Sequence, residues 1–223
     1  MFIVCDGIVK GSGNDLATPS LLLNILNPNA DAEPNDTQFE YEALGEESED
    51  MINRAKVYTG YYEPFLGKSV PYILVVKVGN EGEKSSPGNR GKRDSQLILL
   101  RFLSRCHFDS DLSPLELEMR TRFDVDFGVD PNFFEYLLFV DADTTLSLDS
   151  INHLVSSCVH DQAIVGLCGT TEIANDQDTF VTMIQVGLIV FIFSFLYRRT
   201  SMQCRIPLQR LSNLCSIRKF PRV

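Results

Sequence analysis

The stretch LLFVDADTTL (Leu137–Leu146) is an apolar run that ends in two aspartates separated by one alanine. The run predicts a buried strand over Phe133–Val140 that leads into Asp141 and Asp143. Side chains two residues apart on a strand point the same way, so we expect both carboxylates to face one ligand. A bare Asp-x-Asp is more often an acidic turn, but FFEYLLFV before it and two threonines after it favour a Mg²⁺ or Mn²⁺ site.

Strand-like and helix-like segments alternate on both sides of this stretch. Further strands are expected at Phe2–Cys5, Val70–Val78 and Ala163–Cys168. Helices are expected within Gly11–Ile25, from about Lys92 onward, within Asp109–Asp130, and over Asp149–Cys158 with Asp149 as N-cap. The alternation predicts an α/β fold with a mainly parallel sheet and flanking helices.

Three groups of polar residues follow predicted strands. Asp6 follows the first strand, a Gly-rich loop precedes Lys92, and Asp141 and Asp143 follow the strand quoted above. Ligands of parallel α/β sheets bind outside the carboxyl ends of the strands. We therefore expect these residues to surround the ligand.

Composition excludes several classes of function. The 223 residues are 44% hydrophobic, which is enough for a core, and the net charge of −10 argues against a nucleic-acid partner. The cysteines show no CxxC pair or regular spacing, so we expect reduced thiols and neither a disulfide framework nor a zinc site. Those cysteines are Cys5, Cys106, Cys158, Cys168, Cys204 and Cys215.

Two segments differ from the rest in composition. Asn27–Asp50 is polar and acidic, which predicts a surface loop. Val186–Tyr197 is apolar and precedes a basic tail, but it is shorter than the about 20 residues that cross a bilayer. It is a short or tilted span, an interfacial segment or an aberrant sequence, and the positive-inside rule would place the basic tail in the cytoplasm.

Two chemistries fit an Asp-x-Asp at a strand end. In a haloacid-dehalogenase-like phosphatase, Asp141 would be the nucleophile and Asp143 the acid/base. That chemistry also needs a downstream lysine and a second acidic pair, whereas only Lys219 follows Thr145 and no such pair follows. The phosphatase is therefore the less favoured alternative.

The second chemistry is glycosyl transfer from a nucleotide-sugar, in which a metal neutralises the departing diphosphate. Such a site also needs an aspartate for the nucleobase and a cation near the phosphates. Asp6 and the pair Lys92 and Arg93 could supply both. Alone, Asp6-Gly7 is usually a strand-ending turn and GNRGKRD a solvated basic loop, so only the combination favours this chemistry.

Several longer stretches resemble the catalytic domain of fungal chitin synthases, which are family 2 glycosyltransferases. The resemblance runs over about residues 1–185 and includes FIVCDGIVKGSGND, SSPGNRGKRDSQ, FFEYLLFVDADTTLSLDSINHLV and VGLCGTTEIAN. It implies an incomplete GT-A-like domain, the fold of nucleotide-diphospho-sugar transferases. The implied reaction transfers N-acetylglucosamine from UDP-N-acetylglucosamine to a growing β-1,4 chitin chain with Mg²⁺ or Mn²⁺.

The resemblance also implies roles for individual residues. Asp6, with Gly7 of the same CDG motif, would contact the uridine, and Lys92 and Arg93 would lie near the diphosphate. Asp141 and Asp143 would bind donor and metal. For full-length relatives it implies a chitin acceptor, membrane helices, and a place at the cytosolic face of the plasma membrane in cell wall synthesis.

Two motifs of the family do not occur in this sequence. They are the Glu-Asp motif that carries the general base and the Gln-x-x-Arg-Trp motif that binds the acceptor; the chain contains no Trp. We therefore assign no catalytic residue and expect a truncated catalytic domain over 1–185 with an aberrant or membrane-associated tail over 186–223. Little or no polymerisation is expected from this chain alone, and a non-catalytic UDP- or metal-binding remnant stays an alternative.

Overall fold

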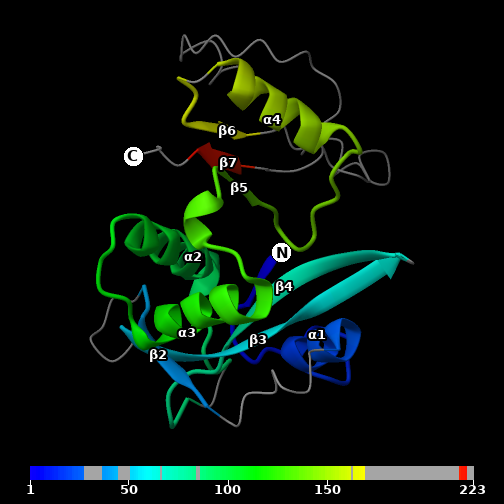
Figure 1. Ribbon diagram of the computed structural model, residues 1–223. Helices are drawn as coiled ribbons and strands as arrows, with labels where there is room; N and C mark the ends of the chain where they lie inside the picture. The colour runs from blue at the N-terminus through cyan, green and yellow to red at the C-terminus, as the bar shows by residue number, and fades with distance from the viewer. Residues whose placement is uncertain are drawn as a thin grey trace, which may run out of the picture. The chain divides into compact units, whose positions relative to one another are not determined.

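The computed structural model describes residues 1–27, 37–44, 51–65, 67–83, 86–161, 163–168 and 216–219, which belong to two compact units (Figure 1). The units are Met1–Phe133 and Phe134–Val223. The boundary predicted between residues 185 and 186 lies outside the described residues, and so does Val186–Tyr197. None of the described helices combines the length and the apolar character needed to cross a membrane.

The first unit is built on a sheet in the order β1-β4-β3-β2. Its strands are β1 (Phe2–Cys5), β2 (Phe39–Glu42), β3 (Ile52–Phe65) and β4 (Lys68–Lys77). β1 and β4 are parallel, whereas the other two pairs are antiparallel. The α/β class is confirmed, but the mainly parallel sheet is wrong for this unit, which has a mixed sheet. β3 ends at Phe65 and β4 begins at Lys68, and strands so close together in the sequence can pair only in the antiparallel direction.

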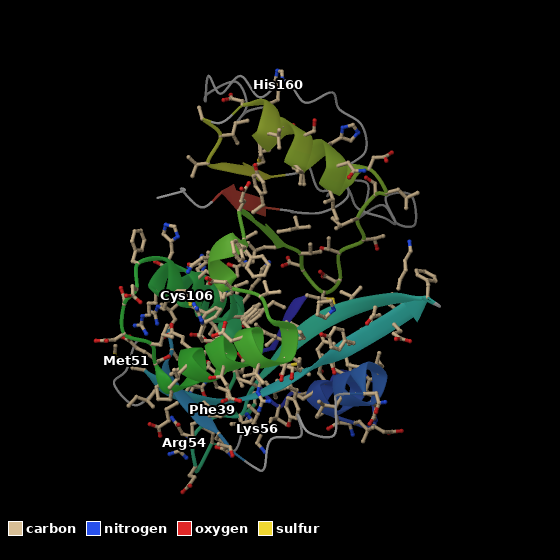
Figure 2. All side chains as sticks on the ribbon, viewed as in Figure 1. Phe39, Met51, Arg54, Lys56, Cys106 and His160 are labelled. Atoms are coloured by element: carbon tan, nitrogen blue, oxygen red, sulfur yellow. The ribbon has the colours of Figure 1, made fainter. Side chains whose placement is uncertain are left out.

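Within this sheet, the two strands that were not predicted from the sequence, β2 and β3, lie on the far side of β4 from β1. β2 lies inside Asn27–Asp50, so the predicted loop is wrong there: FEYE buries Tyr41 while Glu40 and Glu42 stay exposed. Residues of β3 alternate between buried and half-buried from Asn53 to Thr59. Arg54 of β3 pairs with Glu40 of β2 at 3.1 Å, near the end of β2 that carries Phe39 (Figure 2). Cross-strand pairs of this kind stabilise the register.

Helices cover both faces of the sheet in the first unit. They are α1 (Thr18–Leu26), α2 (Gly91–His107) and α3 (Pro114–Arg122), followed by a π-helical turn at Phe123–Phe127 and a 3₁₀ turn at Pro131–Phe133. Leu26 of α1 packs with Leu74 and Val76 of β4. Lys77 points to the opposite face, because side chains alternate along a strand, and there it meets α2.

The second unit holds a three-stranded sheet and one helix. Its elements are β5 (Tyr136–Phe139), α4 (Ser150–His160), β6 (Gly166–Cys168) and β7 (Ser216–Lys219), with the sheet order β5-β7-β6. Leu154 and Cys158 of α4 pack on Leu167 of β6. The predicted strand and helix positions are confirmed to within a few residues. Asp149 is the N-cap residue of α4, but its side chain makes no capping hydrogen bond.

The side chains of three cysteines are described, and none of Cys5, Cys106 and Cys158 forms a disulfide bond. The reduced state of the other cysteines stays a prediction. Burial raises the pKa of the Cys5 thiol to about 11, so this group stays protonated at neutral pH.

Candidate functional site

The parallel register of β1 and β4 brings Asp6 and Lys77 together. Cys5 pairs with Val76 at the carboxyl end of the two strands, and the next residue of each chain segment is Asp6 or Lys77. Lys77 Nζ lies 2.8 Å from Asp6 Oδ1; the Lys77 side chain is fully buried and that of Asp6 is 28% exposed. Lys77 was not predicted as a site residue from the sequence. A lysine inside the apolar run VPYILVVKV was the available signal, since a buried ammonium needs a carboxylate partner.

One oxygen of Asp6 accepts every hydrogen bond that this carboxylate makes among the described residues. Oδ1 accepts from Lys77 Nζ, from the backbone N–H of Arg90 at 3.0 Å and from that of Gly91 at 3.2 Å. Arg90 and Gly91 are the N-cap and first residue of α2, where free amides and the helix dipole favour an anion. Oδ2 is therefore the oxygen that can accept a hydrogen bond from a ligand.

A second carboxylate, Asp94 in the first turn of α2, also neutralises Lys77. Its Oδ2 lies 2.6 Å from Lys77 Nζ and its side chain is 2% exposed. Tyr41 donates its hydroxyl proton to the same oxygen at 2.9 Å, and the backbone N–H of Leu44 donates to Oδ1 at 2.8 Å. Burial, and then the charge of Asp94, raise the pKa of Tyr41 well above its ordinary value, so the phenol stays a neutral donor.

The polar network continues from Tyr41 to the loop after β4. Asn53, the register partner of Tyr41, donates through Nδ2 to the Tyr41 hydroxyl at 2.9 Å and to the carbonyl of Gly88 at 3.1 Å. Asn53 is fully buried. Its placement explains why a polar residue occupies an inward position of β3, and why sequence periodicity did not reveal that strand.

Two glycines allow close backbone contacts of the loops after β1 and β4. Gly7 has φ +91°, and a Cβ there would lie 2.7 Å from the carbonyl oxygen of Pro87. Gly88 has φ +78°, and a Cβ there would lie 2.7 Å from the carbonyl group of Lys77. The left-handed conformation and the backbone contacts both require glycine. Gly7 therefore has a structural role, and its predicted contact with a nucleotide stays a prediction.

Glu83 holds the loop after β4 closed. Its carboxylate accepts from the backbone N–H of Gly88 at 2.8 Å and of Asn80 at 3.1 Å, and it pairs with Arg90 at 2.5 Å. The hydrogen bond from Arg90 is the main cause that lowers the pKa of Glu83 to about 2. Because Arg90 is also the N-cap of α2, this ion pair links the loop to the backbone that holds Asp6.

We expect Glu83 to make stability depend on pH in the acid range. Its pKa is about 2 in the folded chain against an ordinary 4.5, so the unfolded chain takes up the proton first. The stabilisation is fully present above about pH 4.5 and is lost as the pH falls toward 2. Allowing for solvent screening, Glu83→Gln should remove about 1 kcal/mol of the stability difference between pH 5 and pH 2.5.

Urea unfolding at both pH values measures this difference. Glu81→Gln is the matched control, because Glu81 belongs to the same loop but its side chain is 97% exposed. Equal pH dependence in Glu83→Gln and the wild type would contradict the prediction.

The predicted basic residues lie at the same edge of the first unit as Asp6. Lys92 and Arg93 are both exposed and follow Gly91, whose amide binds Asp6. The structure therefore brings Asp6, Gly7, Lys92 and Arg93 to neighbouring positions. Their contact with a diphosphate stays a prediction.

Asp141 and Asp143 belong to the second unit and lie in a turn. β5 ends at Phe139, and the turn is closed by a hydrogen bond from the Thr144 N–H to the Asp141 carbonyl at 3.0 Å. The expectation that the two aspartates share one side of a strand is therefore wrong. Asp141 is half-buried and Asp143 exposed.

The carboxylates of this turn nevertheless suit a hard cation. Mg²⁺ commonly takes one or two protein carboxylates and completes its shell with substrate phosphates and water. Within the described ranges, no group of three or more His, Cys, Asp or Glu side chains forms a metal site. The binding of Mg²⁺ or Mn²⁺ thus stays a prediction, for which this turn can supply two carboxylate ligands.

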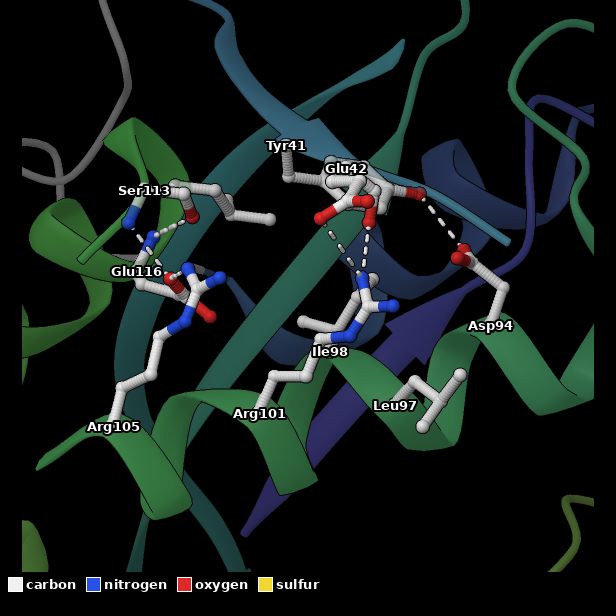
Figure 3. A pocket seen from close by; sticks show the side chains of 10 residues that line it. Tyr41, Glu42, Asp94, Leu97, Ile98, Arg101, Arg105, Ser113 and Glu116 are labelled. Atoms are coloured by element: carbon white, nitrogen blue, oxygen red, sulfur yellow. Dashed lines mark hydrogen bonds and ion pairs between the residues drawn. The ribbon is translucent and has the colours of Figure 1, made fainter. Parts of the chain in front are cut away.

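A small hollow lies between β2, α2 and α3 (Figure 3). Its volume is about 20 Å³, which is room for about one water molecule. Arg105 at its rim pairs with Glu116 at 2.5 Å, and Arg101 donates to the backbone carbonyl of Glu42 at 2.7 Å. Both cations already have acceptors, so we assign no ligand to this hollow.

Comparison with known proteins shows which family this chain resembles. A family model described as chitin synthase matches residues 1–196. Chitin synthase 7 of Gibberella zeae is 50% identical over 186 residues, which are 82% of this chain and 10% of that protein. Chitin synthase 6 of Mycosarcoma maydis is 48% identical over 186 residues, 83% of this chain and 15% of that protein. Chitin synthase 4 of Cryptococcus neoformans var. grubii is 47% identical over 188 residues, 83% of this chain and 14% of that protein.

The chain therefore spans a small part, between 10% and 15%, of the length of these curated relatives. No solved structure matches it.

Proposed function

The chain belongs to the chitin synthase family, and from this premise we propose that it forms part of the donor-binding region of a glycosyltransferase. The enzyme transfers N-acetylglucosamine from UDP-N-acetylglucosamine to a growing β-1,4 chitin chain. Part of this proposal is a GT-A-like fold, and another part is a place at the cytosolic face of the plasma membrane. Neither the phosphatase nor the non-catalytic remnant is favoured by the family match.

The observation that carries the proposal is the arrangement around Asp6. Its Oδ1 is held by Lys77 and by two amides of α2, so Oδ2 can accept a hydrogen bond from the imide N–H of uracil. Lys92 and Arg93 lie in the first turn of α2, where their charges and the helix dipole favour a diphosphate. Base and phosphates of one nucleotide would thus meet suitable groups at one edge of the sheet.

The metal has a separate role. Asp141 and Asp143 would hold Mg²⁺ or Mn²⁺, which supplies positive charge to the departing diphosphate when bound. An exposed and a half-buried carboxylate in one turn can each offer an oxygen to a hard cation.

Nucleotide binding tests the proposal. Asp6 should favour UDP over CDP, because uracil N3 carries a proton that a carboxylate accepts whereas cytosine N3 is itself an acceptor. Asp6→Asn should weaken UDP binding roughly tenfold and narrow the UDP/CDP difference, because its amide can donate to cytosine. Isothermal titration of the full chain with both nucleotides and Mn²⁺ measures these affinities.

Asp15→Asn is the control, since Asp15 is an exposed carboxylate in the loop between β1 and α1. Equal affinity of the wild type for UDP and CDP, or no binding of either, would refute the proposed role of Asp6.

Two activity measurements accompany the titration. Labelled UDP-N-acetylglucosamine should yield little or no polymer with this chain alone, because no residue of it matches the family's general-base or acceptor motifs. Polymer formation would contradict that expectation. Release of phosphate from a phosphomonoester, abolished in Asp141→Asn, would instead support the phosphatase.

A further inference from the structure

We propose that Lys77 is a positioning residue that acts through Asp6 and fixes its free oxygen for the nucleobase. This inference rests on the proposed function, because it takes a uracil-like imide N–H as the donor to Asp6 Oδ2. It concerns a residue that the nucleotide itself does not touch.

The ammonium group of Lys77 has an acceptor for each of its three protons. They are Asp6 Oδ1 at 2.8 Å, Asp94 Oδ2 at 2.6 Å and the carbonyl oxygen of Gly91 at 3.4 Å. The side chain has no exposed surface. Any effect of Lys77 on a ligand must therefore pass through a neighbour, and of its two carboxylate neighbours only Asp6 has substantial exposed surface.

Asp94 keeps Lys77 in place from the buried side. Its two oxygens accept from Lys77, from Tyr41 and from the amide of Leu44. Tyr41 is held in turn by Asn53, whose other proton goes to Gly88. Asp94 of α2 thus sets the buried position of the ammonium before any ligand arrives, while residues of β2 and β3 support Asp94.

The distribution of charge also distinguishes Lys77 from a simple buried ion pair. A single carboxylate would neutralise one ammonium, yet Lys77 contacts two. Asp94 is buried and has three donors, so the unbalanced negative charge falls on Asp6, whose side chain is 28% exposed. Three donors on Oδ1 restrict rotation of this carboxylate, and a fixed Oδ2 binds a ligand N–H without the cost of ordering it.

Binding of two nucleotides distinguishes a positioning role of Lys77 from a role in folding alone. UDP carries the N3 proton that Asp6 would accept, and N3-methyl-UDP lacks it. The wild type should prefer UDP by roughly tenfold or more, as expected for a hydrogen bond to a charged acceptor. Lys77→Met should bind UDP roughly tenfold more weakly and bind N3-methyl-UDP about as the wild type does. Equal weakening for both nucleotides would overturn the proposal.

Tyr41→Phe is the matched structural control. It removes a buried hydrogen bond to Asp94 but leaves the Lys77–Asp6 contact intact. Its stability should fall while its preference for UDP over N3-methyl-UDP is kept. Loss of that preference in Tyr41→Phe would show that any damage to the network suffices, which would overturn a specific role for Lys77.

If the Lys77→Met variant does not fold, a measurement on the wild-type chain still tests the proposal. The NMR signal of the Lys77 ammonium should shift when UDP binds and stay unchanged with N3-methyl-UDP, because only UDP donates a hydrogen bond to Asp6 Oδ2. Shifts with both nucleotides, or with neither although UDP binds, would overturn the proposal.

If the wild-type chain binds no UDP, the proposed function is refuted. The positioning role of Lys77 is then tested by the NMR couplings that report the χ1 rotamer of Asp6. One χ1 rotamer in the wild type and averaging in Lys77→Met would support it. The same single rotamer in both would overturn it, and so would averaging in the wild type.

Discussion

Gly88→Ala should lower the free energy of unfolding of the first unit by about 3 kcal/mol, because the added Cβ causes both backbone strain and overpacking. Gly88 has φ +78°, and an added Cβ would lie 2.7 Å from the Lys77 carbonyl group and from the Gly79 amide nitrogen. These neighbours are backbone atoms at the end of β4, so they cannot move aside as a side-chain tip would. Any shift also disturbs the Gly88 carbonyl that accepts from Asn53.

The matched control is Gly82→Ala in the same loop. Gly82 has φ +105° with no atom within 4 Å of an added Cβ, so it should show only the strain of the left-handed conformation, about 1 kcal/mol. Urea unfolding followed by tyrosine fluorescence measures both variants, since the chain has no Trp and Tyr41, Tyr58, Tyr61, Tyr62 and Tyr72 all lie in the first unit. Similar losses in the two variants would contradict the close contact at Gly88.

Continuous apolar runs were predictable as strands, whereas the alternating strands were not. The strand at VPYILVVKV is evident because most of its residues are apolar, and β4 lies there. β3 buries Asn53 and Thr59 at inward positions, so its alternation of buried and half-buried residues does not coincide with apolar and polar letters. β2 is short and lies between acidic segments, and only its pairing with β3 makes it a strand. Tertiary pairing overrode local composition in both cases.

Several residues of the candidate site could be predicted from the sequence, but the buried network behind them could not. Asp6 and Lys92 follow strand and loop signals that can be read locally. Lys77, Asp94 and Tyr41 meet only because the parallel register of β1 and β4 and the start of α2 coincide in space. A buried lysine in a strand indicates that a carboxylate is near, but the sequence alone does not identify that carboxylate.

Asp143→Ala should abolish the Mn²⁺-dependent part of UDP binding, a loss of about 100-fold, because even residues that merely orient metal ligands contribute 10–100-fold to metal affinity. Asp143 is exposed in the turn after β5, and its carboxylate would be one of few protein ligands of a cation that also takes phosphate oxygens. UDP binding without metal should stay unchanged in this variant, since Asp6, Lys92 and Arg93 belong to the other unit. Titrations of UDP with Mn²⁺ and with a chelator give the two affinities.

Asp149→Ala is the control, because Asp149 is an exposed carboxylate of the same unit without a capping hydrogen bond. An undiminished effect of Mn²⁺ in Asp143→Ala, or an equal loss in Asp149→Ala, would remove Asp143 from the proposed metal site.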